Sequence, residues 1–187
     1  RYDYYRVTYD KNNASSCTKT SEILRDGRAV DLAPTCTRTG YTFKGWSLDG
    51  SKVTSYNITG SDITLVAIWD ANAYTIAFNG NGANGGSTGN ASCTYDVNCT
   101  LTSNGFTKTG YSFAGWATSA NGSVVYANGD TVNNLATSGT YTLYAKWNVN
   151  SYTVTFNGNG CGSPNPTSKT VTYDSTYGTL PTPQRIG

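Results

Sequence analysis

The chain has 187 residues, of which 13% are charged, and its formal net charge is +2 at pH 7. A composition so close to neutral, with no run of one sign, is not typical of a protein that binds nucleic acid or an acidic membrane surface. The sequence has no His and a single Glu, Glu22, so it lacks the commonest general base and metal ligand and offers no matched pair of carboxylates. We therefore expect no enzyme activity, no catalytic residue, no metal and no cofactor.

Three short segments recur along the chain in constant order. The first opens with Tyr and ends in Asn-Gly-Asn-Gly in two of its copies, the second reads Gly-Tyr-x-Phe-x-Gly-Trp, and the third reads Thr-Leu-x-Ala-x-Trp. Their copies lie at residues 5–13, 74–82 and 152–160 for the first, 40–46 and 110–116 for the second, and 64–69 and 142–147 for the third. This order predicts three repeats. We number them repeat 1 (residues 1–70), repeat 2 (71–148) and repeat 3 (149–187).

The spacing of these segments separates rigid from variable parts of each repeat. The first half of the repeat has a nearly constant length, whereas the second half of repeat 2 is eight residues longer than that of repeat 1, with the extra residues between 117 and 140. Such an insertion is typical of a surface loop. Gly187 stands where Gly40 and Gly110 stand, so we interpret repeat 3 as an N-terminal half and the chain as a piece of a longer protein.

The repeated segments alternate apolar and polar residues with a period of two, from the opening segment of each repeat to its closing Trp segment. Tyr74, Ile76 and Phe78, for example, alternate with Thr75 and Ala77. Period two with β-branched and aromatic residues predicts half-buried strands. Only residues 25–32 and 132–135 could supply a helical turn, and no stretch approaches the length of about 18 apolar residues that spans a bilayer. We expect a mainly β fold with little helix and no membrane insertion in this segment.

The three segments together resemble the Listeria/Bacteroides repeat, the B-repeat of internalin-type bacterial surface proteins, over nearly the whole chain. The resemblance implies a small α+β, β-grasp-like domain, arranged in tandem between an anchored end and an adhesive end of a secreted bacterial protein. It supplies no catalytic residue. Repeat 1 departs from the pattern at residues 10–13, which read Asp-Lys-Asn-Asn, so we do not expect the Asn-Gly-Asn-Gly loop to have a general role.

Five cysteines occur at positions that are not equivalent between repeats. Confinement to single repeats favours a disulfide between Cys17 and Cys36 and a second between Cys93 and Cys99, and the alternative is that these are buried free thiols. Cys161 has no partner within its own repeat and is expected to be unpaired in this chain. Its expected partner lies beyond Gly187 in the longer protein, and the alternative is a cysteine of another molecule.

The run Gly80-Asn-Gly-Ala-Asn-Gly85 fits the glycine fingerprint of dinucleotide-binding proteins, but its context does not. No amphipathic helix follows it, and no acidic residue lies about twenty positions further on. Carboxylates that could bind calcium are missing from both Asn-Gly-Asn-Gly loops. We interpret these loops as turns, in which Asn and Gly tolerate positive φ.

Aromatic residues at equivalent positions are the predicted core of each repeat, since a domain this small has few other large apolar side chains to bury. The predicted core residues are Trp46, Trp69, Trp116, Trp147, Tyr41, Phe43, Tyr111 and Phe113. The alternative for the Trp residues is a sugar-stacking platform. The 15 Tyr exceed what two small cores need, and those at 2, 4 and 5 could form an exposed adhesive patch.

These observations favour a non-enzymatic stalk or spacer in an extracellular protein of the bacterial cell surface. One alternative is an adhesion module whose partner is a protein or glycan of a host or a neighbouring cell. Another is a filament subunit, in which repeat 3 is completed by strands from another copy of the chain.

Overall fold

The computed structural model describes residues 1–182; the predicted landmark Gly187 lies outside the described residues. No described residue is helical, so the helical turns considered at residues 25–32 and 132–135 do not form. The prediction of a mainly β fold in tandem units is confirmed. No helix long and apolar enough to cross a membrane occurs within residues 1–182.

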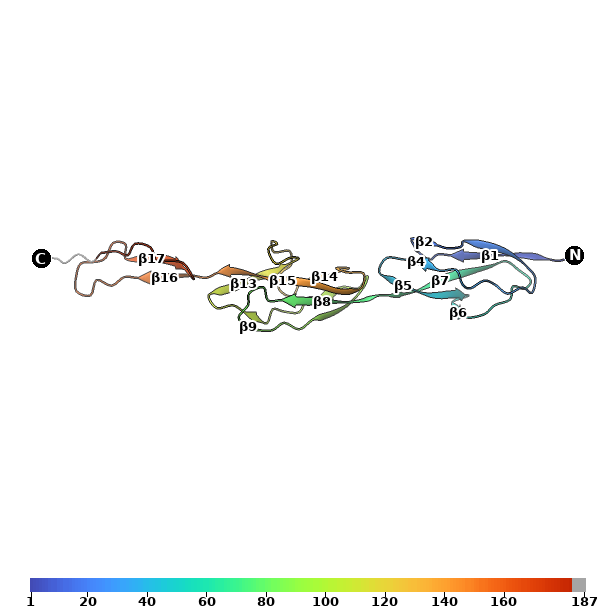
Figure 1. The fold of residues 1–187 in the computed structure, drawn as a ribbon, viewed down its shortest axis with the longest axis horizontal. Coiled ribbons are helices and arrows are strands. Elements are labelled where there is room, and N and C mark those ends of the chain that lie inside the picture. Colours follow the sequence, from blue (N-terminus) through green and yellow to red (C-terminus); the bar gives the residue numbers. More distant parts are fainter. Residues whose placement is uncertain (183–187) are drawn as a thin grey trace. The chain divides into compact units, whose positions relative to one another are not determined.

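Repeat 1 forms a five-stranded sheet in the order β3-β1-β7-β5-β6, of which Figure 1 labels β1, β5, β6 and β7. Its strands are β1 (Tyr4–Asp10), β3 (Ser21–Arg25), β5 (Tyr41–Leu48), β6 (Ser51–Val53) and β7 (Ile63–Ala71). The opening strand β1 is antiparallel to β3 and parallel to the closing strand β7. On its other side β7 is antiparallel to β5. A separate two-stranded ladder joins β2 (Ser16–Cys17) to β4 (Cys36–Thr37).

Repeat 2 forms a four-stranded sheet in the order β10-β8-β15-β13. These strands are β8 (Ala73–Asn79), β10 (Ala91–Thr94), β13 (Tyr111–Ala117) and β15 (Gly139–Val149). Two short ladders accompany the sheet, β9 (Gly85–Gly86) with β12 (Phe106–Thr107) and β11 (Cys99–Thr100) with β14 (Thr131–Val132). In repeat 3, β16 (Ser151–Thr155) pairs antiparallel with β17 (Ser168–Thr172), and the two strands form a hairpin.

The second Gly of each Gly-Tyr-x-Phe-x-Gly-Trp segment lies at a β-bulge. The register of β5 on β7 shifts between Phe43 and Gly45, and that of β13 on β15 shifts between Phe113 and Gly115. Gly45 and Gly115 have φ of 114° and 142°, which L side chains rarely adopt. The repeated glycine is therefore required by the backbone of the bulge.

The two complete repeats have matching cores. Val7, Trp46 and Leu65 in repeat 1 and Ile76, Trp116 and Leu143 in repeat 2 are at most 1% exposed. The Phe residues of the repeated segments are half-buried and contact the core Trp, with ring centroids 5.4 Å apart for Phe43 and Trp46 and 4.9 Å apart for Phe113 and Trp116. The cores thus centre on the first Trp of each repeat.

Besides Phe43 and Phe113, four more of the predicted core residues are less buried than expected. Trp69 and Trp147 are only half-buried. They lie near the ends of β7 and β15, where their indole N–H groups donate to carbonyl groups of the loop that follows the opening strand. Tyr41 and Tyr111 are also half-buried, and their rings contact Tyr residues of the following repeat. Some positions that recur between the repeats therefore contact the loop after the opening strand or the next repeat, and not only the core.

By its internal contacts the chain divides into two compact units. One contains residues 1–76, 91–99 and 131–141, and the other contains residues 77–90, 100–130 and 142–187. Several strand and turn segments of repeat 2 thus belong to the same compact unit as repeat 1, whereas the rest of repeat 2 shares the other unit with repeat 3. The side-chain contacts described in the next subsection each lie within one of these two units.

Candidate functional site

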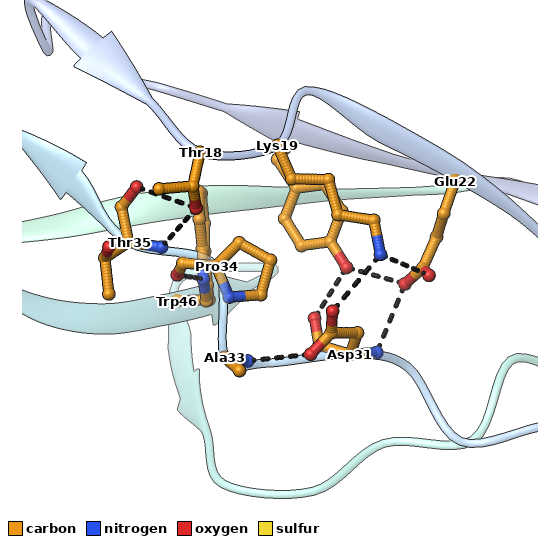
Figure 2. Close-up of polar contacts among 9 residues, drawn as sticks. Thr18, Lys19, Glu22, Asp31, Ala33, Pro34, Thr35 and Trp46 are labelled. Carbon is orange, nitrogen blue, oxygen red and sulfur yellow. Dashed lines mark hydrogen bonds and ion pairs between the residues drawn. The ribbon is translucent and has the colours of Figure 1, made fainter.

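A cluster of titratable side chains lies in repeat 1 (Figure 2). Lys19 Nζ donates hydrogen bonds to Glu22 Oε2 at 2.7 Å and to Asp31 Oδ2 at 3.2 Å. The Tyr9 hydroxyl lies 2.6 Å from Glu22 Oε1, and the backbone N–H of Asp31 donates to the same oxygen at 3.1 Å. Every charged group in the cluster therefore has a partner within it.

The pKa values in this cluster are shifted by its hydrogen bonds and by burial. The hydrogen bond to Glu22 raises the pKa of Lys19, which favours the ammonium form. Burial by itself raises the pKa of Glu22, but the hydrogen bonds from Lys19, Tyr9 and Asp31 outweigh it and hold that pKa below its usual value. Burial, followed by the hydrogen bond to Glu22, raises the pKa of Tyr9. None of these pKa values is shifted towards pH 7, near which a general base is most effective.

The same directions disfavour an amide crosslink between Lys19 and Asp31. That reaction requires an unprotonated amine and a protonated carboxyl. The backbone N–H of Ala33 and the Lys19 ammonium hold the pKa of Asp31 below its usual value, which favours the carboxylate. We interpret the pair as an ion pair that fastens the loop around Asp31 to the sheet.

The loop after each opening strand is occupied by internal hydrogen bonds. In repeat 2, Asn81 Nδ2 donates to the carbonyl oxygen of Ala145 at 2.9 Å, and Trp147 Nε1 donates to the carbonyl oxygen of Gly80 at 2.9 Å. We name this set of contacts the loop clamp. It joins the end of the opening strand to the closing strand.

Repeat 1 builds the same loop clamp from a different sequence. Asn12 Nδ2 donates to the carbonyl oxygen of Ala67 at 2.9 Å, and Trp69 Nε1 donates to that of Asn12 at 3.0 Å. Asp10 accepts from the backbone N–H of Asn12, as Asn79 does from Asn81. The clamp therefore depends on one Asn side chain in each loop and does not need the Asn-Gly-Asn-Gly sequence. Within residues 1–182 no three His, Cys, Asp or Glu side chains form a group that could hold a metal ion.

The structure joins the two cysteine pairs proposed from the sequence. Cys17–Cys36 connects β2 to β4, and Cys93–Cys99 connects β10 to β11 across the turn at residues 95–98. Cys161 is an exposed free thiol.

The Tyr cluster at the start of the chain is divided between core and surface. Tyr5 is half-buried and packs against the core of repeat 1. Tyr2 and Tyr4 are 63% and 61% exposed, and the Arg25 guanidinium lies 3.4 Å from the centroid of the Tyr2 ring. Two Tyr rings therefore remain available on the surface.

The most regular site in the described chain is the junction between one repeat and the next. At the first junction the backbone N–H of Asn72 donates to the carbonyl oxygen of Gly40, and that of Tyr95 donates to the carbonyl oxygen of Asn72, both at 2.9 Å. The centroids of the Tyr41 and Tyr95 rings are 5.8 Å apart, with an edge-to-face arrangement. All four residues belong to the same compact unit.

The second junction repeats this geometry within the other compact unit. The backbone N–H of Asn150 donates to the carbonyl oxygen of Gly110, and that of Tyr173 donates to the carbonyl oxygen of Asn150, again at 2.9 Å. The centroids of the Tyr111 and Tyr173 rings are 5.9 Å apart. The junction is therefore a repeated structural element.

The first junction has additional polar contacts. The Tyr41 hydroxyl donates to Asp96 Oδ2 at 2.7 Å, and Asn134 Nδ2 donates to Asp96 Oδ1 at 2.7 Å. These two hydrogen bonds, with the contribution of Asn134 the larger, hold the pKa of Asp96 below its usual value. Asn72 Nδ2 donates to the carbonyl oxygen of Thr137.

The sequence analysis did not single out the residues of the junction. Their signal was nevertheless present, because Tyr95 and Tyr173 follow the opening Tyr of their repeats by the same 21 residues, and Asn72 and Asn150 precede it by two.

Comparison with known proteins agrees with the division of the chain into three tandem repeats. A sequence profile of the Listeria-Bacteroides repeat domain matches residues 5–68, 74–146 and 152–187. The chain belongs to the Listeria-Bacteroides repeat domain family. The profile thus matches once in each of the three repeats defined from the sequence.

Two curated relatives of this Listeria-Bacteroides repeat protein come from Evansella cellulosilytica. One, named "Putative Gly-rich membrane protein", is 33% identical over 174 residues, which cover 84% of the chain and 20% of the relative. The other, named "Putative membrane protein", is 29% identical over 161 residues, which cover 83% of the chain and 23% of the relative. The chain spans about a fifth of the length of these relatives.

Among solved structures, the Listeria-Bacteroides repeats are similar to Streptococcal High Identity Repeats in Tandem (SHIRT) domains 3-4 from a cell surface protein. The match has a TM-score of 0.26 and 17% identity, and it covers 78% of this chain and 98% of that one. A TM-score this low does not establish a common fold.

Proposed function

We propose that the chain supplies non-enzymatic stalk or spacer repeats to a bacterial cell-surface or membrane-associated protein, outside the cell. The observation that carries the proposal is the junction, which is built twice from a Gly carbonyl, a linker Asn and an edge-to-face Tyr pair. A repeated junction is what a tandem array requires, since each repeat then meets the next in the same way. Family membership and the membrane-protein names of the relatives support the location.

A non-enzymatic role also agrees with the side chains of the described residues. The one dense titratable cluster has its groups paired and its pKa values shifted away from neutrality. The loop at residues 80–85, whose sequence fits the glycine fingerprint, uses the side chain of Asn81 in the loop clamp. Both sets of residues therefore have structural tasks.

The proposal can be tested by displaying the chain on a cell between a membrane anchor and a fluorescent tag. One and two tandem copies of residues 1–148 are compared for the height of the tag above the membrane. A spacer is expected to raise the tag by one fixed increment per copy, and Tyr2→Ser/Tyr4→Ser is expected to leave that increment unchanged. A height that does not increase with copy number would contradict the proposal.

An adhesive role is the second candidate, and the exposed rings of Tyr2 and Tyr4 favour it. Aromatic rings beside an Arg are typical of surfaces that bind proteins or sugars. Saturable binding of the chain to host cells or to a glycan array, lost in Tyr2→Ser/Tyr4→Ser, would support adhesion. A filament is the third candidate, and the 49% exposed Tyr152 on β16 favours it. Growth of particle size with concentration in light scattering would support the filament.

A further inference from the structure

We infer that Tyr95 and Tyr173 are plugs that couple each repeat to the one before it, and that the sockets are the Gly-Tyr pairs Gly40–Tyr41 and Gly110–Tyr111. The socket is an interaction surface, and its partner is a turn of a following repeat that carries an aromatic ring. The inference concerns the folding of the chain and does not depend on the proposed location or on adhesion.

The fit between plug and socket is close at both junctions. A Cβ atom added to Gly40 would lie 2.3 Å from the ring of Tyr95, and one added to Gly110 would lie 2.2 Å from the ring of Tyr173. Each ring therefore occupies the space that a side chain would need. Gly50 shows that this crowding is not a general property of turn glycines, because it has a similar φ and nothing within 4 Å of an added Cβ.

A cation stacks on the Tyr of each socket. The Arg38 guanidinium lies 3.7 Å from the centroid of the Tyr41 ring, and Lys108 Nζ lies 4.4 Å from that of Tyr111. Each socket thus presents a Tyr ring with a cation against it, and the plug ring approaches the same Tyr edge-to-face. Such contacts restrict the orientation of the rings beyond what apolar burial requires.

Repeat 1 has the same turn without the plug. The backbone N–H of Asp26 donates to the carbonyl oxygen of Asp3 at 2.9 Å, as that of Tyr95 does to Asn72. The backbone of the turn is therefore common to all three repeats, whereas the aromatic ring occurs only in repeats 2 and 3. A socket should therefore accept the turn of repeat 2 or 3 and not that of repeat 1, because the Asp26 turn has no aromatic ring to place against the glycine.

The hairpin of repeat 3 depends most on its plug. Two-stranded hairpins are marginally stable by themselves in water. Tyr152 on β16 is 49% exposed, whereas its counterpart Tyr74 in repeat 2 is 2% exposed. The contacts of Tyr173 and Asn150 with Gly110 and Tyr111 join this hairpin to the preceding repeat. We expect these contacts to keep the hairpin ordered.

Hydrogen exchange of the full, monomeric chain followed by mass spectrometry tests the inference. Tyr173→Ala is expected to speed exchange in peptides from β16 and β17 roughly tenfold and to leave peptides from β1 and β7 unchanged. The matched control is Tyr177→Ala, since Tyr177 follows the same hairpin and is 60% exposed, and no change is expected. Equal exchange in the two variants, or a hairpin already unprotected in the unaltered chain, would overturn the inference.

A glycine comparison tests the first junction in the full chain. Gly40→Ala and Gly50→Ala both place a side chain at positive φ, but only Gly40→Ala meets a ring. The inference expects Gly40→Ala to lower the thermal midpoint more than Gly50→Ala, and it expects this excess to disappear in the Tyr95→Ala background. Equal shifts for the two variants, or an excess that persists without the Tyr95 ring, would show that the socket does not couple the repeats.

Discussion

The opening strands of repeats 2 and 3 have nearly the same sequence and very different burial. Tyr74 and Ile76 on β8 are 2% and 0% exposed, whereas Tyr152 on β16 is 49% exposed. β8 lies between two neighbours in its sheet, and β16 pairs with β17 alone among the described strands. The comparison teaches that the alternating pattern determines which side chains share a face, while more distant segments determine whether that face is covered.

The largest expected effect is loss of a complete repeat. Trp116→Ala should lower the free energy of unfolding of repeat 2 by about 3 to 5 kcal/mol, because it removes a side chain that is 0% exposed and leaves a cavity. Differential scanning calorimetry should show the loss of one transition. Trp46→Ala should remove the transition of repeat 1 instead. An unchanged melting temperature together with lost sugar binding would support the platform interpretation of the Trp residues.

The disulfides should contribute less than the core Trp residues. The loop-entropy relation gives a destabilisation of about 3 kcal/mol for Cys17→Ser/Cys36→Ser and about 2 kcal/mol for Cys93→Ser/Cys99→Ser, since the first disulfide closes the longer loop. Urea unfolding of both variants measures the difference. Non-reducing peptide mapping checks the pairing itself, and a link from Cys17 or Cys36 to Cys93 or Cys99 would contradict it.

Substitutions in the loop clamp compare a complete repeat with repeat 3 directly. Asn81→Ala should destabilise repeat 2 by roughly 1 to 2 kcal/mol, because it leaves the carbonyl group of Ala145 without this donor. Asn159 adopts the same turn, with its backbone N–H bonded to Asn157 Oδ1. Asn159→Ala should change stability by no more than about 0.5 kcal/mol, as for a surface substitution. Equal effects of the two variants in urea unfolding would mean that the clamp contributes nothing beyond the turn.

The smallest expected effect is a pH dependence confined to repeat 1. The pKa of Glu22 is lowered in the folded chain. Glu22 therefore stabilises the folded repeat above the ordinary pKa of Glu, and this stabilisation is lost as the pH falls through the folded pKa. The pKa of Lys19 is raised, so its contribution is lost as the pH rises through its folded value. Repeat 2 has Ala91 at the position of Glu22. Glu22→Gln should therefore flatten the acid side of the stability curve of repeat 1 and leave repeat 2 unchanged, as followed by melting from pH 3 to 7.

The sequence predicts the strands well, because the three repeated segments carry a clear period of two. The expectation that large apolar side chains of a small domain are buried holds for Trp46 and Trp116. It fails for Trp69 and Trp147, which are half-buried. The structure gives the two proposed cysteine pairs as well. Each of these features follows from residue type and local spacing.

The junctions and the loop clamp could not be predicted in the same way. Tyr41 looks like a core residue because it and Phe43 alternate with the polar Thr42. Its ring nevertheless contacts Tyr95, which lies 54 positions further on. Asn12 bonds to Ala67 over 55 positions. Periodicity describes one strand at a time, so it cannot show which distant segment covers a given side chain.

The parallel pairing of β1 and β7 has a consequence for mechanical force. The two strands run side by side in the same direction, with Val7 opposite Ile63 and Asp10 opposite Val66. Tension applied at the two ends of repeat 1 pulls β1 backwards and β7 forwards along their common axis. The hydrogen bonds between them then carry the force simultaneously in shear, whereas a hairpin pulled open at its ends breaks its bonds one after another. A repeat pulled through these two strands resists extension more than the β16–β17 hairpin does when it is pulled through its own ends.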